Sequence, residues 1–76
     1  MIDKKYGLTL KTLRIEKGLS QEELAARVGL HRTYISQLER GIKSPSLRTM
    51  EKICGEIGIS LTLFVEYMEK SNNSRQ

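Results

Sequence analysis

Residues 20–41 (SQEELAARVGLHRTYISQLERG) carry the pattern that most restricts how this chain can fold. They contain two short runs of apolar residues at helical spacing: Leu24, Ala25, Val28, Ile35 and Leu38. Gly29 follows the first run, where a left-handed backbone is easiest for glycine, and the small Ala25 lets a second helix cross closely. The stretch therefore predicts two short helices joined by a tight turn, the arrangement in which a helix-turn-helix reads DNA with its second helix.

The remaining sequence predicts an all-α chain of five short helices in a single domain. Apolar periodicity places helices at about 4–17, 32–40, 47–57 and 61–69, in addition to the one between Ser20 and Gly29. The domain is expected to span residues 1–76. Its polar ends, residues 1–5 and 70–76, are expected to be flexible.

Capping residues fix where two of these helices begin. Ser20 and Glu23 have the spacing of a capping box, in which each side chain accepts from the other residue's backbone amide. Pro45 disfavours helix at the residue before it, so Ser46 can cap the helix at 47–57. We expect that helix to bury Leu47 together with the apolar residues that follow it.

Several motifs match a known family at the same spacings. They are the Leu13-Arg14 pair and the segments KGLSQEELA (17–25), ISQLERG (35–41), PSL (45–47) and GISL (58–61). With them, residues 10–66 resemble the repressor and Cro-like helix-turn-helix family (the XRE type) of phage, plasmid and bacterial transcription regulators, which implies a lambda-repressor-like fold. Within that family, HRTYIS (31–36) and the lack of a second domain resemble the controller proteins of restriction–modification systems, although phage and plasmid repressors share most of these features.

The polar side chains that the helix at 32–40 leaves outside its apolar stripe are the predicted base-reading residues. They are Arg32, Thr33, Ser36 and Gln37. Arg32 can donate two hydrogen bonds to guanine, and Gln37 can bond adenine through N6 and N7. The short Thr33 and Ser36 permit close approach, and the Thr33 methyl group can pack on a thymine methyl group. The alternative for this surface is an ordinary solvated helix face.

A second group of residues is predicted to contact the DNA backbone: Gln21, Tyr34, Arg40, Lys43 and Ser44. Gln21 lies at a helix amino terminus, which favours phosphate contact, although a solvated first-turn residue is the alternative. The resemblance implies that the segment after the second helix grips phosphates. Arg14 has two interpretations, a phosphate contact or, as the family implies, an internal ion pair with Glu39.

The helix at 61–69 is apolar on more than one side. Leu61, Phe64, Val65 and Met68 form one stripe, whereas Leu63 and Tyr67 lie four residues apart on another. One stripe suffices to cover the core of a single chain, so we expect a homodimer whose interface includes Leu63, Phe64 and Tyr67. A small satellite core is the alternative.

Composition limits the partners and the chemistry. The formal net charge of +4 agrees with an anionic partner such as double-stranded DNA. The single cysteine, Cys54, allows no intrachain disulfide and favours a cytoplasmic location. No apolar run approaches the length of about 20 residues that crosses a membrane. Because His31 is the only histidine and no nucleophile–base pair is present, no metal, cofactor, small-molecule ligand or catalytic residue is expected.

These features predict a sequence-specific DNA-binding transcription regulator that acts as a homodimer on a near-palindromic operator. The resemblance implies a restriction–modification controller that regulates its own gene and the endonuclease gene. A phage or plasmid repressor is the first alternative. An antitoxin-type interaction protein is the second, and it is disfavoured because only seven polar residues follow the last predicted helix.

Overall fold

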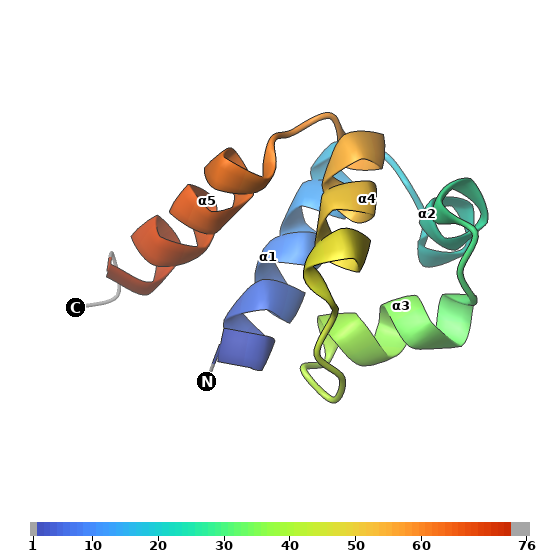
Figure 1. Ribbon diagram of the computed structural model, residues 1–76, viewed down its shortest axis with the longest axis horizontal. Helices are drawn as coiled ribbons and strands as arrows, with labels where there is room; N and C mark the ends of the chain where they lie inside the picture. Colours follow the sequence, from blue (N-terminus) through green and yellow to red (C-terminus); the bar gives the residue numbers. More distant parts are fainter. Residues whose placement is uncertain (1, 74–76) are drawn as a thin grey trace.

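The computed structural model describes residues 2–73, which form an all-helical fold with no strand among them (Figure 1). The elements are α1 (Ile2–Glu16), α2 (Gln21–Val28), α3 (Arg32–Glu39), α4 (Leu47–Ile57) and α5 (Leu61–Asn73). In Figure 1, α3 runs along the lower right of the molecule beneath α2, and α5 lies at the far left, with α1 and α4 between them. The amino-terminal end of α1 lies toward the same lower edge of the molecule as α3 and the loop that follows it.

A single core joins all five helices, and α1 contributes to it along most of its length. The fully buried side chains come from every helix: Leu10, Leu24, Ile35, Leu38, Ile53, Cys54 and Phe64. Helix α1 packs against both α3 and α5, and α2 packs against α3 and α4. The helix-turn-helix therefore rests on α1 and α4 rather than standing alone.

Gly7 lets α1 approach α3 more closely than any other residue would allow. A Cβ atom at Gly7 would collide with the carbonyl oxygens of Leu38 and Glu39 at the end of α3. Backbone atoms cannot move aside as a flexible side chain can, so the crossing of α1 and α3 requires glycine here. The sequence pattern did not identify this position.

The predicted bounds were right for α4 and wrong at the two ends of the chain. Helix α1 begins at Ile2, two residues before the predicted start, and α5 continues to Asn73, four residues past the predicted end. The prediction relied on apolar periodicity, which fades in both places and therefore gives no signal for the additional residues. Residue 1 and residues 74–76, the outermost parts of the expected flexible ends, lie outside the described residues.

Leu47 is not buried, contrary to expectation. Its side chain is 73% exposed because Ser46, whose hydroxyl accepts from the Thr49 amide, places Leu47 in the first turn of α4, ahead of the buried stripe. The α4 stripe begins instead with the half-buried Met50 and continues through Ile53 and Ile57.

Candidate nucleic-acid interface

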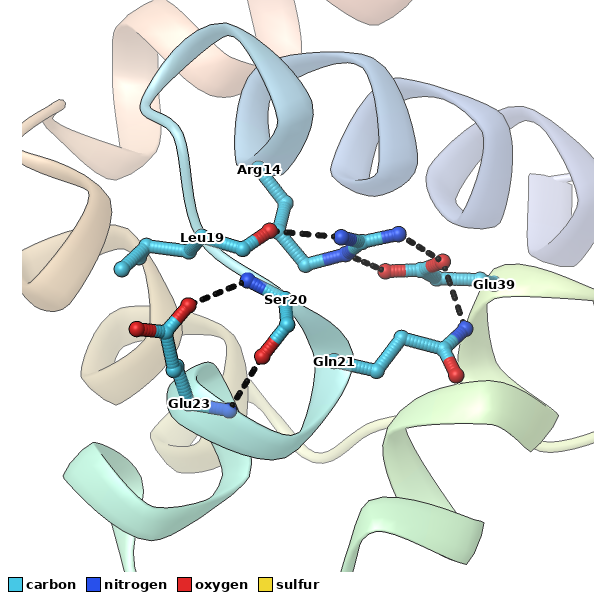
Figure 2. Close-up of polar contacts among 6 residues, drawn as sticks. All are labelled: Arg14, Leu19, Ser20, Gln21, Glu23 and Glu39. Carbon is cyan, nitrogen blue, oxygen red and sulfur yellow. Dashed lines mark hydrogen bonds and ion pairs between the residues drawn. The ribbon is translucent and has the colours of Figure 1, made fainter.

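The turn between α2 and α3 has the local geometry that the sequence predicted. The Ser20 hydroxyl accepts from the Glu23 amide at 2.9 Å, and the Glu23 carboxylate accepts from the Ser20 amide at 2.8 Å, which completes the capping box (Figure 2). The bond from the Ser20 amide to the carboxylate, together with a smaller effect of the Ser20 side chain, lowers the pKa of Glu23 below its ordinary value. Gly29 has φ 72°, and the Leu30 amide reaches back to the Ala25 carbonyl at 2.9 Å, which closes α2.

The outward face of α3 carries the four predicted base-reading residues. Ile35 and Leu38 are fully buried, so the opposite side of this two-turn helix faces away from the core. Arg32 and Thr33 are exposed, whereas Ser36 and Gln37 are half-buried along the same helix. No core contact requires the polar groups of these residues, and a shallow hollow of about 390 Å³ adjoins Arg32 and Thr33. The helix can therefore enter a groove with these side chains foremost.

A buried polar network fixes α3 against α1 and α2 (Figure 2). The Arg14 guanidinium donates through Nε to Oε2 of Glu39 at 2.6 Å and through Nη2 to Oε1 at 3.1 Å. Its Nη1 donates to the Leu19 carbonyl at 2.7 Å, in the link between α1 and α2. Because Arg14 is 7% exposed and each of its three side-chain nitrogens donates a hydrogen bond inside the protein, the phosphate interpretation of Arg14 does not fit the structure.

Gln21 belongs to the same network. Its side-chain Nε2 donates to Oε1 of Glu39 at 3.0 Å, which joins the amino terminus of α2 to the carboxy-terminal end of α3 (Figure 2). The side chain is half-buried. Because this bond uses one of its two amide hydrogens, one hydrogen is left that it could donate to a phosphate. Spacing along the sequence gave no signal for this bond, because its partners are 18 residues apart.

The other predicted backbone-contact residues lie at the carboxy-terminal end of α3 and in the loop after it. Arg40, Lys43 and Ser44 are exposed, and Tyr34 is half-buried against the core. Ser44 already has a partner, since its hydroxyl donates to Oδ1 of Asp3 at 2.7 Å. The sequence pattern did not point to Asp3, because residues 1–5 were expected to be flexible.

The predicted dimer residues do not share one surface. Phe64 is fully buried, and its ring lies 4.9 Å from the ring of Tyr6 between centroids, so it belongs to the core of its own chain and is removed from the interface. Leu63 and Tyr67 remain 46% and 48% exposed. Shallow hollows of about 280 and 170 Å³ flank Tyr67, and the exposed Leu8 of α1 lines the smaller one.

Two titratable side chains, Tyr6 and Cys54, are buried in the core. Burial raises the pKa of the Cys54 thiol to about 11 and also raises the pKa of the Tyr6 phenol.

Within residues 2–73, no group of three or more His, Cys, Asp or Glu side chains could hold a metal ion. None of the described helices combines the length and the apolar character needed to cross a membrane.

Several known proteins resemble this chain in sequence or in structure. A family profile described as helix-turn-helix matches residues 10–64. The control protein C.MunI from Mycoplasma sp is 45% identical over 67 residues, which cover 87% of this chain and 90% of the relative. The clp gene regulator ClgR from Corynebacterium glutamicum superposes with a TM-score of 0.94 at 27% identity, over 99% of this chain and 80% of that chain.

A third similar protein has been crystallised on DNA. The restriction–modification controller protein C.Esp1396I, solved as a tetramer in complex with its natural 35 base-pair operator, has a TM-score of 0.81 and 36% identity, with 88% of each chain covered. These relatives are gene regulators rather than enzymes, in agreement with the sequence analysis.

Proposed function

Because this chain belongs to the helix-turn-helix family of DNA-binding regulators, we propose that it binds a near-palindromic operator as a homodimer through two copies of α3. The observation that carries the proposal is the pairing of a solvent-facing polar side of α3 with a buried side locked to α1 and α2. A rigidly held helix can present its side chains to base edges with little loss of conformational freedom on binding. The basic residues near its carboxy-terminal end would supply sequence-independent attraction to phosphates.

Arg32 and Lys43 divide these two roles and give the test. Arg32 opens α3 and is exposed, so Arg32→Ala should weaken operator binding by about 1–3 kcal/mol and relax base preference at the position that it reads. Lys43 lies in the loop after α3, so Lys43→Ala should weaken all sequences alike and reduce the salt slope by about 1.

Footprinting on the DNA upstream of the gene would define the operator. Fluorescence anisotropy would then compare this operator with a random duplex of equal length across a salt series. An equal loss for Arg32→Ala on both duplexes would contradict base reading by α3. A loss confined to the operator for Lys43→Ala would contradict its phosphate role.

The proposed dimer interface consists of Leu63, Tyr67 and Leu8. Each is about half exposed, and Tyr67 lies between two hollows into which a partner's side chain can pack. Burying this surface in a twofold pair would hide apolar area that the monomer leaves in water. Two recognition helices would then be set one DNA turn apart, roughly 34 Å.

Tyr67→Asp should shift the protein from dimer to monomer, because a carboxylate would have to be desolvated in the interface. Sedimentation equilibrium measures the mass directly. Val65→Asp is a matched control on the same helix, since Val65 is 39% exposed and adjoins neither hollow. An unchanged dimer mass for Tyr67→Asp would reject this interface.

The more specific role that we propose is control of a restriction–modification system. One support is the 45% identity to C.MunI, which is a control protein. The other is the likeness to C.Esp1396I, which is a restriction–modification controller protein. A phage or plasmid repressor with the same fold is the competing assignment. Adjacent methyltransferase and endonuclease genes, and repression or activation of a reporter fused to the endonuclease promoter, would decide between the two.

A further inference from the structure

The first turn of α1 packs on the loop that follows α3, and this contact bears on DNA affinity. We propose that Asp3 limits the affinity of the protein for DNA, because it occupies the Ser44 hydroxyl and holds a negative charge beside the phosphate-contacting loop. The inference rests on the proposed function and adds to it a residue that weakens binding. No part of the sequence pattern points to Asp3, which lies in a segment that was expected to be flexible.

The Ser44 hydroxyl is already hydrogen-bonded within the protein. Ser44 donates through Oγ to Oδ1 of Asp3 at 2.7 Å, across 41 residues of sequence. A serine hydroxyl has one hydrogen to donate. While this hydrogen is shared with the carboxylate, Ser44 cannot donate it to a phosphate oxygen. Contact between Ser44 and DNA therefore requires the bond to Asp3 to break or the hydroxyl to rotate away.

Helix α1 packs closely against Gly41. Gly41 has φ 75°, and a Cβ atom there would lie 2.8 Å from Cγ and 3.1 Å from Cα of Lys4. The backbone of α1 thus rests directly on the turn that opens the loop. Asp3 precedes Lys4, so its position beside Ser44 follows from helix packing as well as from the hydrogen bond itself.

Basic residues neighbour both Asp3 and Ser44 in the sequence. The loop and the residues next to it carry Arg40 and Lys43, and the first turn of α1 adds Lys4 and Lys5. These cations favour a polyanion at this end of the molecule. A carboxylate among them opposes the approach of phosphates. Its removal should therefore tighten binding to any sequence, because the effect acts through phosphates and not through bases.

Four proteins form the test: the wild type, Asp3→Ala, Ser44→Ala and the double variant. Their affinities for a random 20 base-pair duplex and for the footprinted operator would be measured by fluorescence anisotropy at about 0.05–0.2 M salt, the range in which phosphate contacts respond. Asp3→Ala should bind both duplexes roughly three- to tenfold more tightly at the low end of this range. Ser44→Ala should lower affinity more in the Asp3→Ala background than in the wild type, because only there is the hydroxyl released.

Two further variants separate charge from hydroxyl release. Asp3→Asn keeps an acceptor for Ser44 and removes the charge, so it should show an increase in affinity smaller than that of Asp3→Ala. Glu56→Gln makes the same change of charge in the last turn of α4, the far end of the helix that begins just after the loop. Its effect should be within twofold of the wild type, since salt screens charges beyond about 10 Å. Far-UV circular dichroism would confirm that every variant is folded.

Unchanged or weaker binding by Asp3→Ala, with the wild type binding DNA, would overturn this inference alone. The same holds if Ser44→Ala lowers affinity equally in both backgrounds, or if Glu56→Gln tightens binding as much as Asp3→Asn. A wild-type protein without salt-dependent DNA binding would instead overturn the proposed function, and the inference with it.

Discussion

The buried pair of Arg14 and Glu39 gives the sharpest prediction about stability. The Arg14 side chain is 9% exposed and that of Glu39 is 2% exposed, so both charges lie almost entirely out of water. The substitution Arg14→Met keeps the aliphatic stem and removes the charge. It leaves the Glu39 carboxylate with one remaining donor, the Gln21 amide, and the Leu19 carbonyl without its side-chain partner.

The expected cost follows from what is left unpaired. Breaking a buried ion pair by removal of one partner costs about 3–5 kcal/mol, because the other charge stays desolvated. A chain of 76 residues has a total unfolding free energy of only about 4–11 kcal/mol. We therefore expect Arg14→Met to lower the melting temperature by about 15–30 °C. Glu39→Gln should cost less, since Arg14 would keep the Leu19 carbonyl and an amide oxygen as acceptors.

Guanidinium denaturation of the two single variants and the double variant would test this account. Removal of both charges avoids an uncompensated ion, so the double variant should be more stable than additivity predicts by at least about 1 kcal/mol. Additive effects, or a loss below about 1 kcal/mol for Arg14→Met, would refute the view that the pair is buried and coupled. The denaturant m-value should stay constant, as required if only stability changes.

Two other buried groups give further predictions. The Tyr6 hydroxyl has no hydrogen-bond partner among the described residues, and its ring packs against Phe64. Because Tyr6→Phe removes only the hydroxyl, it should leave the unfolding free energy unchanged or raise it by about 1 kcal/mol. A decrease of that size would show that the hydroxyl is needed. Because burial raises the pKa of Cys54 from 9.0 to about 11, the unfolded state loses the thiol proton at a lower pH than the folded state does. The unfolding free energy should therefore fall as the pH rises from about 9 to 11, and it should fall less steeply with pH in Cys54→Ala. Iodoacetamide should accordingly modify Cys54 at pH 8.5 only as fast as the protein unfolds, and rapid modification of the native protein would contradict its burial.

The sequence was informative where structure is decided by local interactions. The capping box at Ser20 and the left-handed Gly29 depend on neighbours within a few residues, and both could be identified from spacing alone. The bounds of α4 followed from Ser46 and Gly58 for the same reason. The polar outer face of α3 required only the positions of Ile35 and Leu38, because helical periodicity determines the rest.

What the sequence did not reveal depends on contacts between distant segments. The need for Gly7 arises from the carbonyl oxygens at the end of α3, and the partner of Asp3 lies 41 residues away. Phe64 was predicted to belong to the dimer interface although it lies on the same stripe as Leu61 and Met68, because helical periodicity does not show how much of each stripe the rest of the chain covers. The structure resolves that choice through the contact between Phe64 and Tyr6.

The polar network also bears on how the protein would recognise its operator. In the proposed dimer, two half-sites are read correctly only if each α3 keeps a fixed orientation relative to the proposed dimer surface on α5. Helix α1 contacts both α3 and α5, and the bonds of Glu39 to Arg14 and Gln21 fix the carboxy-terminal end of α3 to this frame. Loosening the network should therefore reduce discrimination between half-site spacings as well as stability. Glu39→Gln, measured on operators lengthened or shortened by one base pair, would separate this effect from a simple loss of folded protein, since a loss of fold would weaken binding to all spacings equally.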